Sequence, residues 1–132
     1  MIPKTSVLRI ARPTDNLTSI SRMYMAGLGF EVLSEFSYHN GFDGVIIGHP
    51  VHAYHLEFTY HQGEQVGRAP TQDNLLIFYI SDLELWKDAC KKIREAGFIL
   101  VASYNPYWDT LGCTFEDIDG YRVVLQNSEW NV

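Results

Sequence analysis

The most constraining feature of the 132-residue chain is an internal repeat. Gly29-Phe30 recurs as Gly97-Phe98, 68 residues further along, and Gly44 is matched by Gly112 at the same offset. A steady offset between matching positions indicates a duplicated supersecondary unit. The fold of this chain therefore has to be built from two copies of one unit.

Each copy predicts a strand, a helix and three more strands. In the first copy a strand over residues 7–11 stops before Pro13, which cannot donate to a ladder. The helix that follows begins at Thr14, Asp15 or Asn16. Its sheet-facing residues, at helical spacing, are Leu17, Ile20, Tyr24 and Leu28. The remaining strands are predicted to begin at residues 30, 45 and 54.

The second copy follows a polar linker over residues 62–73. It predicts a strand over 75–80, then a helix that Asp82 caps. The apolar stripe of this helix is Leu85, Ala89, Ile93 and Ala96. Strands are predicted over 98–101, 113–115 and 121–126.

Composition narrows the function. The formal net charge is −6 and no basic cluster is present, which argues against nucleic acid and against an anionic membrane surface as partners. No apolar run is long enough to span a bilayer, and the N-terminus does not resemble a signal peptide. Cys90 and Cys113 are expected to be reduced thiols, so we expect a cytoplasmic protein.

The stretch Tyr54–Thr59 reads as a strand with one ionisable face. Leu56 and Phe58 alternate with His55 and Glu57, so the imidazole and the carboxylate share a face. That face meets water, lines a pocket or has a buried partner for its charge. The equivalent of Glu57 in the second copy is Val124, at an offset of 67.

Four motifs accompany the duplicated unit. They are Leu8-Arg9-Ile10, the segment from Tyr24 to Leu33, His55-Leu56-Glu57-Phe58 and the segment from Glu116 to Arg122. With these motifs in this order, the chain resembles the vicinal oxygen chelate superfamily, which includes glyoxalase I, extradiol dioxygenases and the bleomycin and fosfomycin resistance proteins. Ile118 stands where that superfamily usually has a proline in its acidic-Asp-Pro-Asp-Gly turn.

The resemblance implies an α+β fold in which two βαβββ modules form a cupped half-barrel sheet. Metal-dependent members take one ligand from the first and one from the last strand of each module. Carried over to this chain, those positions are about Thr5, Glu57, about Leu75 and Val124. A transition metal generally needs at least three imidazole, carboxylate or thiolate ligands, and only Glu57 qualifies. We therefore expect no metal cofactor. A divalent metal held by Glu57 and His55 is the alternative.

Glu57 is the best catalytic candidate, and no other catalytic residue can be named. It can equally be a carboxylate that pairs with Arg9 or Arg122. Tyr107 and Trp108 can form a stacking wall for an aromatic ligand, a lid on the core or a dimer contact. The expected ligand-binding residues are Arg9, His55, Glu57, Tyr79, Tyr107, Trp108, Arg122 and Gln126. His49, His52 and His55 are spaced by three, so they cluster only if their loop folds back.

These observations predict a single domain over residues 4–129, made of modules 4–62 and 73–129. The leading functional interpretation is a small-molecule-binding protein of the glyoxalase and bleomycin-resistance type, with a degenerate metal site, that sequesters or senses an organic ligand. One alternative is a metal-dependent glyoxalase-like lyase or isomerase, and another is a ligand-free structural dimer module. Whether the protein is an enzyme stays open. We expect a homodimer from the resemblance.

Overall fold

The structure, a computed structural model, describes residues 1–131. Contacts between residues group the chain into two compact units. The first unit contains Met1–Met25 and Gly29–Gly67, and the second contains Ala26–Leu28 and the chain from Arg68 onward. Each unit is described by itself.

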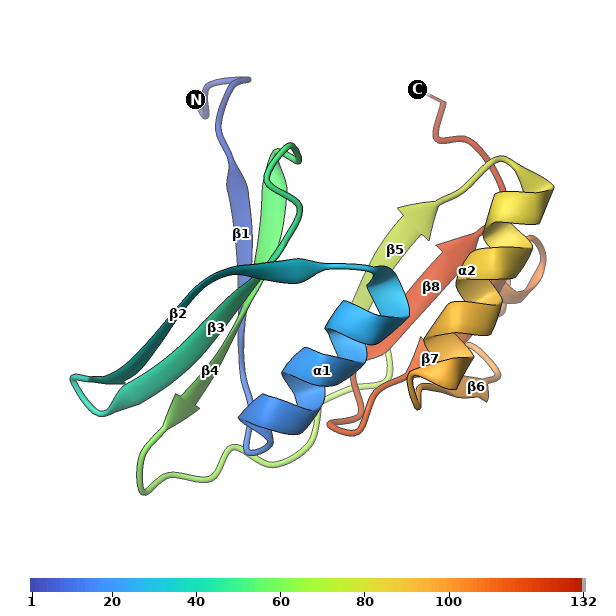
Figure 1. The fold of residues 1–132 in the computed structure, drawn as a ribbon. Coiled ribbons are helices and arrows are strands. Elements are labelled where there is room, and N and C mark those ends of the chain that lie inside the picture. The colour runs from blue at the N-terminus through green and yellow to red at the C-terminus, as the bar shows by residue number, and fades with distance from the viewer. Residues whose placement is uncertain (132) are drawn as a thin grey trace. The chain divides into compact units, whose positions relative to one another are not determined.

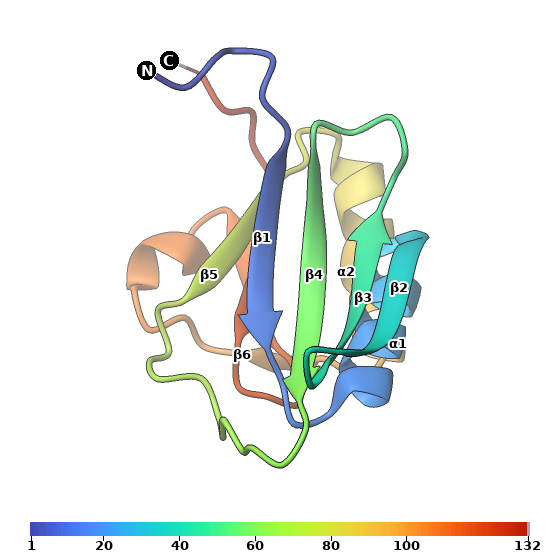
Figure 2. The ribbon, with the colours of Figure 1, turned by 90° about the vertical axis from the view of Figure 1, so that its left-hand side faces the viewer.

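The first unit is a four-stranded sheet with the order β1-β4-β3-β2 (Figure 2). Strand β1 runs parallel to β4, whereas β3 is antiparallel to both β4 and β2. The elements of this part of the chain are β1 (Leu8–Pro13), α1 (Leu17–Leu28), β2 (Glu31–His39), β3 (Phe42–Gly48) and β4 (Tyr54–His61).

Helix α1 packs on one face of this sheet through Tyr24. The Tyr24 ring lies 5.0 Å from the ring of Phe58 in β4, and both side chains are buried. Arg12 Nη1 of β1 donates to the Tyr24 hydroxyl at 3.1 Å. The helix ends at Gly29, whose φ of 71° is the left-handed conformation that glycine adopts most easily. The α1 side of the sheet therefore carries Arg12 and Phe58.

The start of α1 is bonded to the end of the first unit. Asn16 is the N-cap residue, but its side chain makes no capping bond. The Asp15 carboxylate instead accepts the backbone N–H groups of Val66 at 2.9 Å and of Gly67 at 2.8 Å. Two residues after Gly67, the chain is bonded within the second unit, where the N–H of Ala69 donates to the carbonyl of Asp119 at 2.8 Å.

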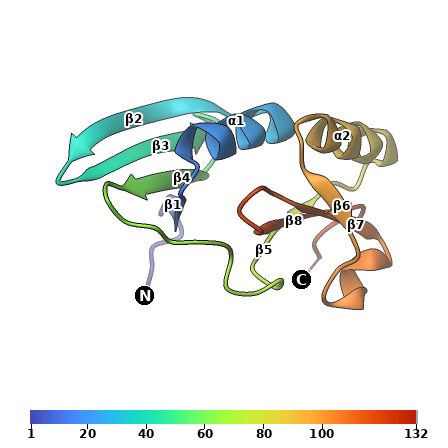
Figure 3. The same ribbon diagram turned by 90° about the horizontal axis from the view of Figure 1, so that it is seen from below.

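The second unit repeats the arrangement, with the sheet order β5-β8-β7-β6. Strand β5 is parallel to β8, and β7 is antiparallel to both β8 and β6. Helix α2 lies along one face of this sheet, against β7 and β8 (Figures 1 and 3). The elements are β5 (Leu75–Tyr79), α2 (Leu83–Glu95), β6 (Ile99–Val101), the short 3₁₀ helix η1 (Pro106–Asp109), β7 (Gly112–Glu116) and β8 (Arg122–Gln126).

The prediction of the apolar stripe of α2 is wrong at one position. Leu85 is 64% exposed, and the half-buried Trp86 faces the sheet instead. Trp86 Nε1 donates to the carbonyl of Leu125 in β8 at 2.8 Å, which holds the indole against the sheet. Asp82 does cap the helix, because its Oδ1 accepts the N–H of Leu85 at 2.8 Å. Ile93 is fully buried, as the periodicity predicts.

The two units confirm the predicted α+β fold of two βαβββ modules. Each four-stranded sheet is open, with one helix of its own module on it, and neither closes into a barrel. The domain bounds 4–62 and 73–129 stay a prediction. Among residues 1–131, no helix is long and apolar enough to cross a membrane.

Candidate functional site

Three polar residues gather on the face of the first sheet that α1 does not cover. In the parallel pairing of β1 with β4, Arg9 is opposite His55 and Ala11 is opposite Glu57. Side chains alternate along a strand, and both Arg12 and Phe58 point toward α1. Arg9, His55 and Glu57 therefore lie together on the uncovered face.

These three side chains form one connected group. Arg9 Nε donates to His55 Nε2 at 2.8 Å, so the neutral His55 ring carries its proton on Nδ1. Arg9 Nη1 lies 3.6 Å from Glu57 Oε2. The Glu57 side chain is 15% exposed, whereas that of Arg9 is 47% exposed. Of the two arginines considered as partners of Glu57, Arg9 is the one that the structure pairs with it.

The neighbouring strand β3 gives this group an apolar flank. Ile46 is opposite Glu57 and is 8% exposed, and Gly48 is opposite His55. A Cβ on Gly48 would lie 3.1 Å from the Cβ of His55, so the glycine allows the His55 side chain its close approach to β3. A buried apolar side chain therefore borders the charged pair on the β3 side.

The histidines before β4 form a pair without His55. The rings of His49 and His52 are 4.8 Å apart, edge to face, and His52 stacks on Tyr54 at 5.2 Å. Burial raises the pKa of the Tyr54 hydroxyl above its ordinary value of 10.0. The loop thus folds back far enough to join two of the three histidines, while His55 is turned to Arg9. Residues 1–131 contain no group of three or more His, Cys, Asp or Glu side chains that could hold a metal ion.

The side chains present do not fit a divalent metal. Strand β1 begins at Leu8, so Thr5 precedes it and the placement of a ligand position at Thr5 is wrong. The β1 residue that reaches Glu57 is Arg9, whose guanidinium has only donors and cannot ligate a metal. The two positions in the second unit, Leu75 and Val124, are hydrocarbon side chains without a ligating atom.

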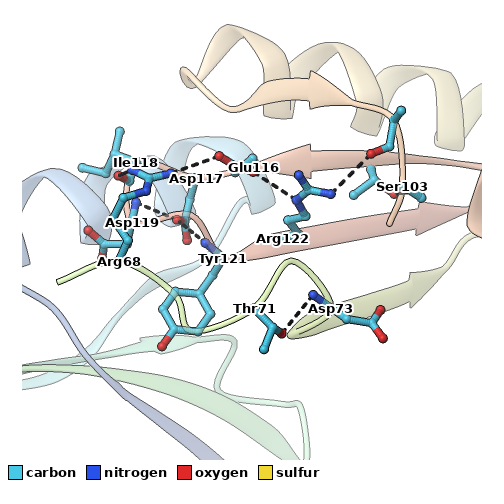
Figure 4. A network of polar contacts seen from close by, with 12 residues as sticks. Arg68, Thr71, Asp73, Ser103, Glu116, Asp117, Ile118, Asp119, Tyr121 and Arg122 are labelled. Atoms are coloured by element: carbon cyan, nitrogen blue, oxygen red, sulfur yellow. Dashed lines mark hydrogen bonds and ion pairs between the residues drawn. The ribbon is translucent and has the colours of Figure 1, made fainter. Parts of the chain in front are cut away.

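In the second unit, the equivalent uncovered face holds a buried arginine. Arg122 Nε contacts Glu116 Oε2 at 3.0 Å, and Arg122 Nη1 donates to the carbonyl of Ala102 at 3.3 Å. The other oxygen of Glu116 accepts from Arg68 Nη2 at 3.1 Å (Figure 4). The Arg122 side chain is only 6% exposed, so Glu116 neutralises a cation that is almost withdrawn from water.

The turn between β7 and β8 is fixed by Asp117. Its Oδ1 accepts the backbone N–H groups of Asp119 at 2.8 Å and of Tyr121 at 3.0 Å. Gly120 has a φ of 89°, which suits glycine alone among the turn residues. Ile118, which replaces the proline of the superfamily's turn, is 42% exposed. The turn motif thus acts through the Asp117 carboxylate and Gly120.

Gln126 is the other polar residue of β8 on this face. It is 3% exposed, and its Oε1 is the buried side-chain oxygen without a hydrogen-bond partner in residues 1–131. The oxygen lies over Gly112, where a Cβ would clash with it. Tyr79 is opposite Gln126 in β5, and its ring lies 5.9 Å from that of Trp130.

The aromatic pair Tyr107 and Trp108 lies in η1. Their rings stack in parallel with centroids 4.9 Å apart, and Asn105 Oδ1 accepts the N–H of Tyr107 at 3.1 Å. Tyr107 is 60% exposed. The sequence reasoning did not foresee the roles of Trp130 and Glu116. Glu116 was visible only as the acidic residue that opens the turn motif, and its position directly before the turn was the available signal.

The two cysteines are free and adjacent in the second unit. Cys90 of α2 and Cys113 of β7 share a side-chain hydrogen bond. Burial, followed by the charge and hydrogen bond of Cys113, raises the pKa of Cys90 to about 12. Burial also raises the pKa of Cys113. Neither thiol has the lowered pKa of a cysteine nucleophile.

Known families match both halves of the chain. The model of the YycE-like N-terminal domain matches residues 8–59, and that of the YycE-like C-terminal domain matches residues 73–127. An uncharacterized protein YycE of Bacillus subtilis is 44% identical over 92% of this chain and 88% of its own length. The crystal structure of a YycE protein of unknown function from the same species superposes with a TM-score of 0.88, at 42% identity, over 97% of this chain and 93% of that one.

More distant solved structures share the fold. Glyoxalase I of Leishmania major has a TM-score of 0.70 at 19% identity, over 92% of this chain and 86% of its own. TnmS3, an antibiotic binding protein from a Streptomyces species, has a TM-score of 0.64 at 16% identity, over 96% of this chain and 98% of its own. The fold and its neighbours define a member of the vicinal oxygen chelate superfamily, as the motifs predict. Within that superfamily, the chain belongs to the YycE-like family.

Proposed function

We propose that this protein binds a small organic molecule without a metal cofactor, in the manner of the resistance and antibiotic-binding members of its superfamily. The observation that carries the proposal is the contact between Arg9 and Glu57, at 3.6 Å on the uncovered face of the first sheet. Glu57 is the one inherited ligand position with a ligating side chain, and its counter-ion is a guanidinium.

The remaining site residues are proposed to serve the same function. Arg9, His55 and Glu57 provide polar anchoring on the first sheet, and Tyr79, Arg122 and Gln126 on the second. Tyr107 and Trp108, with one ring 60% exposed, are proposed as an aromatic contact for the ligand. The antibiotic binding protein TnmS3, which has this fold, supports a binding role rather than a specific reaction.

The proposal includes the assembly and setting of the protein. From the resemblance we propose a homodimer, and from the two free thiols a cytoplasmic setting. We propose neither nucleic acid nor a membrane as partner, because the net charge is −6 and the chain has no basic cluster. A metal-dependent glyoxalase-like lyase or isomerase, and a ligand-free dimer module, are the competing functions. The fold of glyoxalase I supports the first of these, and the side chains at the ligand positions weigh against it.

Elemental analysis decides between the metal-free and metal-dependent functions. The tag-free protein is purified without chelator, and its melting temperature is measured with and without nickel, zinc, manganese and ferrous iron. We expect elemental analysis to find less than about one tenth of an equivalent of metal per chain, the amount that adventitious binding leaves. We also expect none of the metals to change the melting temperature. Stoichiometric metal, or a melting shift that Glu57→Ala abolishes, would favour the lyase or isomerase.

A fragment screen by ligand-observed NMR decides between binding and the structural module. Aromatic and anionic fragments are tested against the wild type and against Glu57→Gln, which keeps the shape of the side chain and removes its charge. Fragments that bind the wild type and change affinity in Glu57→Gln, with a gain expected for anionic fragments, support the binding function. A screen without hits, from a protein that is a stable dimer, would leave the structural module as the function.

A further inference from the structure

Arg9 has hydrogen-bond donors that the folded chain does not use. Its Nε is bonded to His55, whereas Nη1 is 3.6 Å from the Glu57 oxygen, longer than a hydrogen bond. Nη2 makes no hydrogen bond or ion pair with any residue of the described part of the chain. The side chain is 47% exposed, so ligands in solution can reach these donors.

The orientation of the guanidinium is fixed by its two neighbours. His55 holds the Nε side, and Glu57 attracts Nη1 from the same face of the sheet. The edge formed by Nη1 and Nη2 then points away from the His55 bond. That edge presents two parallel N–H groups, the geometry in which a guanidinium binds a carboxylate through two hydrogen bonds.

The shape of the free edge favours a carboxylate among the oxyanions. A carboxylate is planar like the guanidinium, and its two oxygens match the two parallel N–H groups. Glu57 places a negative charge 3.6 Å from the guanidinium and offsets part of the attraction of Arg9 for any anion, so an organic anion gains from the further contacts of its hydrocarbon body. Ile46, opposite Glu57 in β3, borders the pair with an apolar side chain that is itself buried.

Building on the proposed binding function, we infer that the ligand is an organic carboxylate and that Arg9 binds its carboxylate group, at the position where metal-dependent members of the superfamily carry a metal ligand. The inference assigns to the guanidinium the fixed positive charge that a metal ion has in those members. It also explains how Arg9, which has no metal-ligating atom, can serve ligand binding at this position.

The first experiment compares 2-naphthoate with 2-naphthamide, which differ only in the charged group, by titration followed in two-dimensional NMR. We expect the wild type to bind 2-naphthoate at least tenfold more tightly than the amide, since hydrogen bonds to charged groups are worth roughly tenfold or more in affinity. Arg9→Met should remove this preference. Arg9→Lys, which keeps the charge without the fork, should retain part of it. Arg22→Met, an exposed arginine of α1 in the same unit, is the matched control and should bind like the wild type.

The outcomes separate this inference from the proposed function. Equal affinity for the two probes, or an unchanged preference in Arg9→Met, overturns the carboxylate inference even if the fragment screen finds other ligands. Failure of both probes to bind overturns it as well, while the fragment screen alone decides the proposed function. Preference for inorganic phosphate over 2-naphthoate would also overturn it.

The second experiment tests the placement of Arg9 by restoring a metal site. Arg9→His puts an imidazole opposite His55 and on the face of Glu57, which gives two imidazoles and one carboxylate on neighbouring strands. We expect this variant, unlike the wild type, to bind about one equivalent of nickel or zinc, with a higher melting temperature in the presence of the metal. The added substitution Glu57→Gln should abolish the gain. A folded Arg9→His variant that binds no metal would contradict the geometric equivalence.

Discussion

Glu116 is predicted to stabilise the second unit far more than its position in a turn motif suggests. It contacts the buried Arg122 at 3.0 Å with one oxygen and Arg68 at 3.1 Å with the other. In Glu116→Gln the guanidinium of Arg122, whose side chain is 6% exposed, remains in place without a counter-ion. Removing one member of a buried pair costs about 3 to 5 kcal/mol. Glu116 itself is 23% exposed, so we take the lower end of that range, about 3 kcal/mol.

The two arginines should respond differently from Glu116. Arg68→Met removes a side chain that is 65% exposed, so its loss should cost at most about 1 kcal/mol. In Arg122→Met the carboxylate keeps Arg68 as its partner and the buried cation is gone. The double variant Glu116→Gln/Arg122→Met should therefore recover most of the stability that Glu116→Gln loses, because a buried ion pair can be replaced by apolar groups at little cost.

Urea unfolding followed by tryptophan fluorescence measures this effect in the second unit. All three tryptophans, Trp86, Trp108 and Trp130, belong to that unit. A loss of 3 kcal/mol corresponds to a fall in melting temperature of about 10 °C for a chain of this length. The reasoning is refuted if Glu116→Gln lies within about 0.5 kcal/mol of the wild type, the range of an ordinary surface substitution, or if the double variant is less stable than Glu116→Gln.

Further predictions concern the thiols, a glycine and the core. Cys90, with a pKa of about 12, should react with iodoacetamide at pH 8 about a thousandfold more slowly than a free thiol. In denaturant it should react at the rate of a free thiol. A rate for the native protein within about tenfold of that of a free thiol would contradict the raised pKa. Because folding raises this pKa from 9.0, the stability that Cys90 contributes should be fully present below pH 9 and be lost as the pH rises toward 12, and Cys90→Ala should lose less stability over that interval in pH-dependent urea unfolding. Gly112→Ala should destabilise the second unit by about 1 to 3 kcal/mol in the same assay, since its Cβ would lie 2.9 Å from the Leu125 carbonyl and 3.0 Å from that of Trp108; a neutral result would show that the backbone yields freely. Phe58→Ala should cost about 3 to 5 kcal/mol by calorimetry, whereas Phe58→Leu should cost under about 1.5 kcal/mol, and equal losses would argue against close packing at Tyr24.

The features that follow from local periodicity were predictable. The repeat of Gly29-Phe30 as Gly97-Phe98 gave the two modules, and the alternation of His55 and Glu57 with Leu56 and Phe58 gave the polar face of β4. Helical spacing placed Ile93 in the core but also put Leu85, which is 64% exposed, on the apolar stripe instead of Trp86, which we expected in the core or at an interface. The two choices differ by one residue of helix rotation, and the bond from the Trp86 indole to the Leu125 carbonyl decides it.

Partners across strands were harder to predict than faces. Arg9 and Glu57 meet because β1 pairs in parallel with β4 in a register that puts Arg9 opposite His55. A shift of one residue would turn Arg9 to the other side of the sheet. The same limit hid the pairing of Glu116 with Arg122, which depends on the register of β7 with β8. Placing a ligand position near Thr5 was an error of this kind, because Thr5 precedes β1 and the β1 residue that reaches Glu57 is Arg9.

The hydrogen bonds of Asp15 and of Ala69 bear on how the chain can be divided for experiments. Asp15 holds the N–H groups of Val66 and Gly67, and the N–H of Ala69 is bonded within the second unit. A fragment that ends at residue 62 would therefore leave Asp15 without both of its partners, whereas one that ends at Gly67 keeps them. Isolated halves for segmental isotope labelling or intein ligation should accordingly be joined at the peptide bond between Gly67 and Arg68.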